Sequence, residues 1–195
     1  VETAKAALPA NTRITIDAGA HMLPVLHLWR CGERNQSLIS RGLSTMGFAV
    51  PAAIGAALTD RTRPTVAFTG DVGIMMCLGE LGTAVQQVIA PIVVVFNDSA
   101  LTLIGAKQQR RQLAAAGVDF TPTDFAQIAA GFGWNSHRVE QAPALPAAFA
   151  DALARRGIEI DRHRIDLEEP LRHLGTYKVA IRVAPEMVSE VTVAV

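Results

Sequence analysis

Apolar runs with β-branched residues alternate along the chain with helix-like segments. Strand patterns fall at residues 13–17, 65–69, 91–96 and 134–139. Helix patterns fall at residues 47–58, 79–88, 103–113, 124–131 and 146–156. The run 91–96 is almost continuously apolar, which is typical of a strand buried on both faces. This alternation predicts an α/β fold, with a doubly wound, mainly parallel sheet and helices on both faces.

After about Gly157 the pattern changes. The segments IEIDRHRIDLEEP, LGTYKVAIRV and VSEVTVAV alternate polar and apolar positions and are joined by turns. This pattern predicts a small antiparallel extension at the C-terminus. We therefore expect two domains, an α/β domain over residues 1–150 and a β extension over residues 151–195.

Composition narrows the function classes. The chain has 195 residues, half of them hydrophobic, and 18 Lys and Arg balance 18 Asp and Glu. This balance argues against a general polyanion binder. Cys31 and Cys77 lack the spacing of metal ligands. No apolar run is long enough to span a bilayer, and no signal peptide is visible. We expect a cytoplasmic protein, and the start at Val1 in a helix-like segment predicts a piece of a longer chain.

Three polar turns follow predicted strands. The turns DAG, GDVG and NDS begin at Asp17, Gly70 and Asn97. Because ligands bind where parallel strands end near a switch point, we expect these turns to form one site. Gly70 and Gly73 would let the backbone approach a ligand, and the amides of the following helix would hold phosphate oxygens.

Two carboxylates at these ends suggest a metal ion. Asp71 would repel phosphates unless a divalent cation lay between them, and Mg²⁺ is the usual solution. Asp98, 27 positions later, is placed to supply the second ligand. Aspartates at such positions also serve as helix caps and turn residues, and the pattern leaves both interpretations open.

The segment GDVGIMMCLGELGTAV, followed by PIVVVFNDSALTLI, resembles the C-terminal cofactor-binding domain of thiamine-diphosphate enzymes. That group includes the acetolactate synthases and benzoylformate decarboxylases, in which Gly-Asp-Gly is followed by Asn-Asn after the next strand. The resemblance implies that Asp71, Asp98 and the main-chain carbonyl of Ala100 bind magnesium. It also implies that the turn from Gly70 to Gly73 binds the diphosphate.

Two further blocks carry the same resemblance. RGLSTMGFAVPAAIGAAL is similar to the family's Gly-Thr-Met-Gly segment and the helix behind it. The resemblance makes Met46 the residue beneath the bent cofactor, with the Ser44 carbonyl and the Met46 amide facing the aminopyrimidine. DAGAHM resembles the segment in which a Gly-x-His element reaches the diphosphate, which implicates Ala20 and His21.

The sequence departs from the family at two positions. Val72 replaces the third residue of Gly-Asp-Gly, and its β-branch disfavours positive φ and would crowd the diphosphate turn. Asp98 stands where the family usually has Asn, which adds a negative charge that magnesium would offset. Both departures are compatible with a family subgroup and with a cofactor site that is drifting towards disuse.

The resemblance implies the thiamine diphosphate- and Mg²⁺-binding domain of a 2-oxo-acid decarboxylase or carboligase. In the family, the glutamate that activates the cofactor lies on a separate pyrimidine-binding domain, and the segment before Thr12 is too short to hold one. We therefore assign no catalytic residue to this chain. We expect it to work with a pyrimidine-binding domain or chain in a homo- or hetero-oligomer.

The tail carries a second resemblance. GIEIDRHRIDLEEPLRHLGTYKVAIRV, within residues 148–195, is similar to the C-terminal half-domain of ribosomal protein nine of the bacterial large subunit. The resemblance implies ribosomal RNA contacts from arginines, namely Arg155, Arg156, Arg162 and Arg164. The alternative, solvated surface charges, agrees better with seven Lys and Arg against eight Asp and Glu from Asp151 onward.

Two resemblances that meet within one helix suggest a chimera, natural or engineered. In one version of this hypothesis, residues 158–160 form an edge strand of the main sheet. The alternatives to the enzyme domain are therefore an RNA-binding module that uses the tail, or a recombined folding module without activity.

Overall fold

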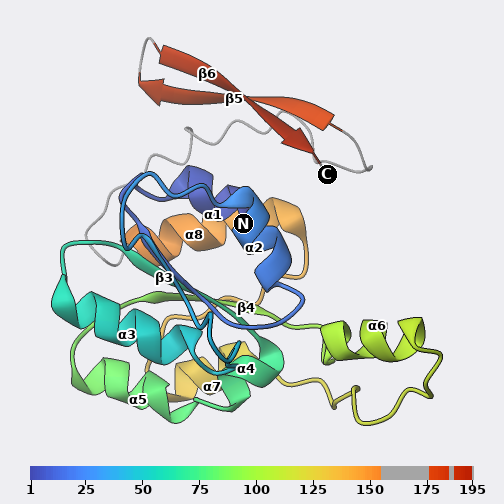
Figure 1. The fold of residues 1–195 in the computed structure, drawn as a ribbon. Helices are drawn as coiled ribbons and strands as arrows, with labels where there is room; N and C mark the ends of the chain where they lie inside the picture. The colour runs from blue at the N-terminus through green and yellow to red at the C-terminus, as the bar shows by residue number, and fades with distance from the viewer. Residues whose placement is uncertain (155–175, 185–186, 195) are drawn as a thin grey trace. The chain divides into compact units, whose positions relative to one another are not determined.

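The computed structural model describes residues 1–154, 176–184 and 187–194. The chain divides into two compact units, one of Val1 with Pro9–Ser136 and one of Glu2–Leu8 with His137–Val195. Figure 1 traces the chain through both units. The predicted edge strand at residues 158–160 and the four arginines of the tail lie outside the described residues. The domain boundary at residue 150 stays a prediction.

The first unit contains a parallel sheet of four strands. These strands are β1 (Arg13–Ile16), β2 (Ser37–Ile39), β3 (Thr65–Gly70) and β4 (Ile92–Phe96). They lie in the order β2-β1-β3-β4, and Ala67 of β3 pairs with Thr15 on one side and Val93 on the other. The chain leaves β1 towards β2 and returns past β1 to β3, so the switch point lies between β1 and β3. The predicted α/β class is confirmed (Figure 1).

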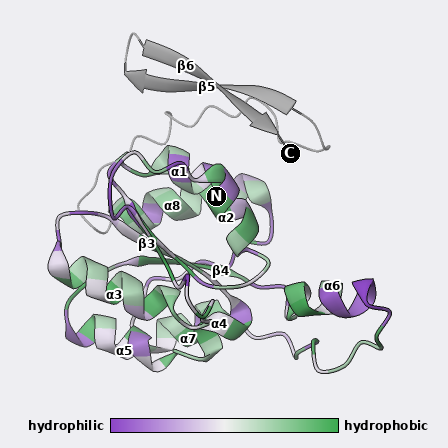
Figure 2. Ribbon diagram, viewed as in Figure 1, coloured by the Kyte–Doolittle hydropathy of each residue, from purple (hydrophilic) through white to green (hydrophobic). Residues whose placement is uncertain are grey.

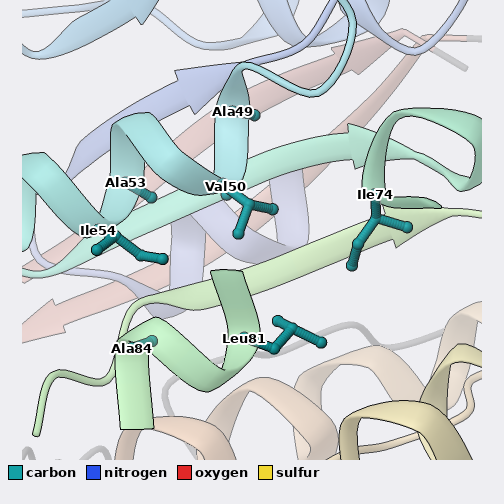
Figure 3. Close-up of a cluster of buried hydrophobic side chains, with 8 residues drawn as sticks. Ala49, Val50, Ala53, Ile54, Ile74, Leu81 and Ala84 are labelled. Carbon is teal, nitrogen blue, oxygen red and sulfur yellow. The ribbon is translucent and has the colours of Figure 1, made fainter. Parts of the chain in front are cut away.

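The first unit also contains the helices α2 (Met22–Leu28), α3 (Ala49–Thr59), α4 (Asp71–Met75), α5 (Gly79–Gln86), α6 (Thr102–Arg110) and α7 (Phe125–Gly131). Helices α2, α3 and α4 contact the sheet, whereas α6 extends away from it (Figure 1). A cluster of buried side chains joins α3, α4 and α5 to β3 (Figure 3): Ala49, Val50, Ala53, Ile54, Ala67, Ile74, Leu81 and Ala84. The small residues of α3 permit this close packing. On the opposite face, Phe68 meets the edge of Trp29 at a centroid distance of 5.8 Å.

Two strand predictions need correction. Residues 134–139 form no strand in the described part of the chain. Two of their side chains instead attach the segment to helices: Trp134 Nε1 donates to Leu81 O at 3.0 Å, and Ser136 Oγ donates to Ala126 O at 2.7 Å. As a consequence β4 lies at the edge of the sheet within the described residues, and its side chains are half-buried, not buried on both faces. The short strand β2 was not predicted.

The helix α6, which falls on the helix pattern at residues 103–113, carries a polar run. No residue of α6 is buried, and Lys107 and Arg110 lie in its last turn. Figure 2 shows that the C-terminal half of this helix is hydrophilic.

The second unit contains α1 (Glu2–Ala7), a short 3₁₀ helix η1 (Ala142–Ala144), α8 (Leu145–Ala154) and the strands β5 (Thr176–Ala184) and β6 (Met187–Ala194). Helix α1 packs against α8, and both contribute buried apolar side chains. Strands β5 and β6 pair antiparallel, with an irregularity between Arg182 and Ala184, which confirms the antiparallel pattern of the tail. Among the described residues, no helix has both the length and the apolar character to cross a membrane.

Candidate functional site

Asp17 is the residue that joins the turns at the switch point. It directly follows β1, is fully buried, and its carboxylate accepts four hydrogen bonds. Oδ1 accepts from the backbone N–H groups of Phe48 and Ala49, both at 2.7 Å. Oδ2 accepts from Thr69 Oγ1 at 2.6 Å and from the Gly47 N–H at 3.2 Å. Asp17 therefore caps α3 from a distant part of the sequence and ties it to the ends of β1 and β3.

The sequence placed Asp17 in a candidate turn but gave it no role. Its signal was its position directly after a buried strand, the same signal that singled out Asp71. The hydrogen bonds to residues 47–49 distinguish Asp17, which caps a helix, from Asp71, which was predicted to bind a metal ion. The local sequence pattern does not show these hydrogen bonds.

Gly73 makes room for this buried carboxylate. A Cβ added at Gly73 would overlap Asp17 Oδ2 and lie 2.7 Å from Thr69 Oγ1. Gly47 has a φ of +73°, and a Cβ there would lie 3.2 Å from Met76 Cβ and 3.5 Å from the Gly73 carbonyl oxygen. The turn at Gly47 and the first turns after β3 are therefore in direct contact.

His21 occupies a second space bounded by glycines. Its ring stacks on Phe96 at the end of β4, with centroids 5.5 Å apart and planes inclined by 17°. A Cβ at Gly70 would lie 3.1 Å from His21 Cε1, and one at Gly19 would lie 2.5 Å from it. Burial lowers the pKa of His21, against the raising effect of the Asp17, Asp71 and Asp98 carboxylates. The imidazole is therefore neutral at pH 7.

Asp71 carries a buried oxygen that lacks a partner. Its side chain is 7% exposed, and Oδ1 accepts from the Val72 N–H at 2.7 Å. Within the described part of the chain, Asp71 Oδ2 and His21 Nε2 are both buried and neither makes a hydrogen bond. Buried polar atoms normally have partners, so these two atoms mark a place that suits a polar ligand.

Asp98 lies in an exposed turn before α6. Its carboxylate accepts from the Ala100 N–H at 3.2 Å and from Thr102 Oγ1. Ala100 also forms an isolated bridge with Asp119. These contacts are those of a turn residue, the alternative that the sequence left open. Asp98 nevertheless acts on the pKa of His21 together with Asp71, so the structure brings the three side chains into one region.

A metal site made of side chains alone is not present in the described residues, since no group of three His, Cys, Asp or Glu could hold an ion there. The predicted set is smaller, two carboxylates and the carbonyl of Ala100. A ligand that brings its own oxygens would have to complete it.

The remaining predicted residues lie around this region. Val72 is inside α4 and is not among the described residues with positive φ, so the backbone strain predicted for it does not occur. Ser44 is exposed and has a φ of 50°, while Met46 and Ala20 are half-buried. The Ala20 carbonyl accepts from the Leu23 N–H at 3.2 Å, at the start of α2.

A family model for the thiamine pyrophosphate enzyme, C-terminal TPP binding domain, matches residues 17–160. The chain belongs to this family. Acetolactate synthase isozyme 1 large subunit of Escherichia coli (strain K12) is 34% identical over 174 residues, which is 87% of this chain and 30% of that protein. Acetolactate synthase of Bacillus subtilis (strain 168) is 33% identical over 162 residues, 83% of this chain and 27% of that protein. The chain thus spans less than a third of the length of these family members.

A solved structure agrees with the family's fold. Benzoylformate decarboxylase from Polynucleobacter necessarius superposes with a TM-score of 0.72 at 24% identity, covering 80% of this chain and 30% of that one. A second model, for the ribosomal protein L9 C-terminal domain, matches residues 146–195. Both predicted resemblances are therefore confirmed, and their matches overlap at residues 146–160. The family's cofactor is thiamine diphosphate, as the sequence predicted, and the unpaired atoms of Asp71 and His21 suit a ligand of this kind.

Proposed function

We propose that the chain is the thiamine diphosphate- and Mg²⁺-binding domain of a 2-oxo-acid decarboxylase or carboligase. The observation that carries this proposal is that Asp71 Oδ2 and His21 Nε2 are both buried and have no hydrogen-bond partner among the described residues. These atoms lie at the turns that end β1 and β3, on either side of the switch point. Membership of the thiamine pyrophosphate family supports the same ligand.

In this proposal Asp71, Asp98 and the carbonyl of Ala100 hold the magnesium ion. Neutral His21 holds a proton on one ring nitrogen and donates it in a hydrogen bond to a diphosphate oxygen. The diphosphate also lies against the backbone of Ala20 and the turn Gly70, Val72 and Gly73.

The second part of the site holds the organic half of the cofactor. The Ser44 carbonyl and the Met46 amide bind the aminopyrimidine, and the Met46 side chain supports the bent shape. When bound, the cofactor supplies the carbanion chemistry of the reaction. The activating glutamate comes from a pyrimidine-binding domain or chain, so turnover requires an assembly in which that partner is present.

Calorimetry tests this proposal with the 195-residue chain. We expect thiamine diphosphate to bind in the presence of Mg²⁺, to bind much more weakly without it, and to lose Mg²⁺-dependent binding in Asp71→Ala. Asp60→Ala is the matched control, because Asp60 also accepts backbone N–H groups but lies just past the C-terminal end of α3. No heat at millimolar cofactor, or equal binding by Asp71→Ala and the native chain, would refute the proposal.

The match of residues 146–195 to the ribosomal domain supports a second candidate, an RNA-binding module. This candidate predicts binding to ribosomal RNA fragments that weakens steeply as salt increases. The same titration with RNA in place of the cofactor separates the two functions.

A further inference from the structure

We propose that Asp17 is the residue that positions the aminopyrimidine-binding segment against the diphosphate turn. It does so by holding the backbone of residues 47–49 at the ends of β1 and β3. This inference rests on the proposed function, because it takes Ser44 and Met46 as the contacts of the aminopyrimidine.

A carboxylate suits this task because it presents two acceptor atoms to four donors. Three of the donors are consecutive backbone N–H groups, those of Gly47, Phe48 and Ala49, at the start of α3. The first N–H groups of a helix have no partner within the helix, and Phe48 at the N-cap offers no side-chain acceptor. Asp17 is fully buried, so it meets this need where water does not reach.

The segment before Gly47 has few ties of its own. Residues 41–45 are exposed, and Leu43 is 90% exposed. Ser44 lies in the left-handed region with a φ of 50°, a conformation that is costly for a residue with a side chain. Ser40 Oγ and Thr45 Oγ1 bond to each other at 2.9 Å, within the same segment. The hydrogen bond from Gly47 to Asp17 is therefore a direct tie between the residue after Met46 and the sheet.

The same carboxylate sets the distance to the diphosphate turn. Thr69 Oγ1 binds Asp17 Oδ2 from the end of β3, and Gly73 closes over this oxygen with no room for a Cβ. Gly47 lies close to the same turn, since a Cβ added to it would come within 3.2 Å of Met76 Cβ and 3.5 Å of the Gly73 carbonyl oxygen. One side chain thus fixes how the segment at Met46 lies relative to the turn from Gly70 to Gly73.

Asp17→Asn separates this task from the capping of α3. The amide oxygen replaces Oδ1 and continues to accept from Phe48 and Ala49. The amide NH₂ then faces Thr69 Oγ1 and the Gly47 N–H. The threonine hydroxyl can turn and accept, but the Gly47 N–H meets a second donor and loses its bond. The opposite orientation of the amide leaves two N–H groups unpaired and is less favourable.

The test compares two probes at saturating Mg²⁺, thiamine diphosphate and inorganic pyrophosphate, by calorimetry on the 195-residue chain. In Asp17→Asn we expect the affinity for thiamine diphosphate to fall by about tenfold or more, and the affinity for pyrophosphate to change by less than about threefold. Only thiamine diphosphate carries the aminopyrimidine that Ser44 and Met46 contact. Asp60→Asn, at the other end of α3, is the matched control and leaves both affinities unchanged.

A second variant covers the case in which Asp17→Asn does not fold, as judged by near-ultraviolet circular dichroism. Gly47→Ala leaves the Asp17 carboxylate in place but moves the same turn, because its Cβ crowds Met76 and its φ is positive. We expect the same selective loss of thiamine diphosphate affinity.

Equal losses for both probes, or no loss for either, in the folded variants would overturn the inference. If the native chain binds pyrophosphate and thiamine diphosphate with equal affinity, the organic half of the cofactor makes no contact with the chain. That result would also overturn the inference. A native chain that binds neither probe refutes the proposed function, and the inference with it.

Discussion

Without ligand, the Asp71→Asn variant should be more stable than the native chain. With thiamine diphosphate and Mg²⁺ bound, the native chain should be the more stable of the two. Asp71 is 7% exposed, and its Oδ2 has no hydrogen-bond partner among the described residues. An unpaired buried polar group costs about 1–3 kcal/mol, and more when it is charged. Asn has the same shape and keeps Oδ1, which accepts from the Val72 N–H, and its NH₂ replaces the unpaired Oδ2. The NH₂ also lacks a partner there but is neutral, so the variant is relieved only of the additional cost of a charged group.

One opposing contribution reduces this gain. Asp71 is the first residue of α4, where a negative charge is favoured by about 0.3–1 kcal/mol. Because α4 spans only five residues, we take the lower part of that range. The expected net effect of Asp71→Asn is therefore about 1 kcal/mol of added stability without ligand. For a chain of this size it corresponds to an increase in Tm of about 2–4 °C.

Urea unfolding of both chains, with and without Mg²⁺ and thiamine diphosphate, measures this change in their order of stability. At a cofactor concentration of about 100 times Kd, the native chain gains about 2.7 kcal/mol, which the variant lacks. The native chain then becomes the more stable of the two. Asp60→Asn is the control, because its amide oxygen keeps the hydrogen bonds that Oδ1 accepts from the Thr62 and Arg63 N–H groups, so any small change in stability is the same in both conditions. A variant less stable than the native chain in the absence of ligand would refute the reasoning, since it would show that Oδ2 is well paired.

Three further predictions concern charge and protonation in the same unit. Asp98→Asn should weaken Mn²⁺ binding in the absence of cofactor by about 1 kcal/mol or less, because Asp98 is exposed. Calorimetry with Mn²⁺ alone measures this change, and unchanged binding would exclude Asp98 as a metal ligand. Burial lowers the pKa of His21 from 6.5, so below pH 6.5 the folded state binds fewer protons than the unfolded state and the free energy of unfolding falls as the pH drops. His21→Gln should make this pH dependence less steep in urea midpoints measured from pH 7.5 to 5, and an equally steep dependence in the variant would contradict the prediction. Burial, with Asp17 and Glu80 nearby, raises the pKa of Cys77 to about 11, so iodoacetamide at pH 8 should label the exposed Cys31 and spare Cys77, as read by peptide mass spectrometry.

Local pattern was enough to predict the parallel sheet and the edge at which the candidate site residues lie. The apolar runs at residues 13–17, 65–69 and 91–96 became β1, β3 and β4, and the polar turns after them came together as expected. These predictions succeeded because strand periodicity and the polarity of turns are properties of neighbouring residues. The prediction for residues 134–139 was wrong: the apolar pattern was there, but in the structure Trp134 and Ser136 bond to carbonyls of α5 and α7, long-range contacts that no local pattern reveals.

Long-range contacts also explain why the role of Asp17 was not visible. Its partners lie 30 to 32 residues away at Gly47, Phe48 and Ala49, and 52 residues away at Thr69. Seen locally, Asp17 and Asp71 are the same feature, an acid directly after a buried strand. The structure separates them by their partners. Asp17 accepts four hydrogen bonds on its two oxygens, whereas the buried Oδ2 of Asp71 accepts none from the described part of the chain.

The glycines after β3 acquire a different physical meaning from this contrast. The sequence attributed Gly70 and Gly73 to the approach of a ligand. In the structure a Cβ at Gly73 would overlap Asp17, and a Cβ at Gly70 would crowd the ring of His21. Each glycine therefore accommodates a side chain from the turns after β1, before any ligand is considered. Asp17 and His21 fill these two spaces, whereas Asp71 Oδ2 has no partner among the described residues and is the atom that a ligand would meet in the proposed function.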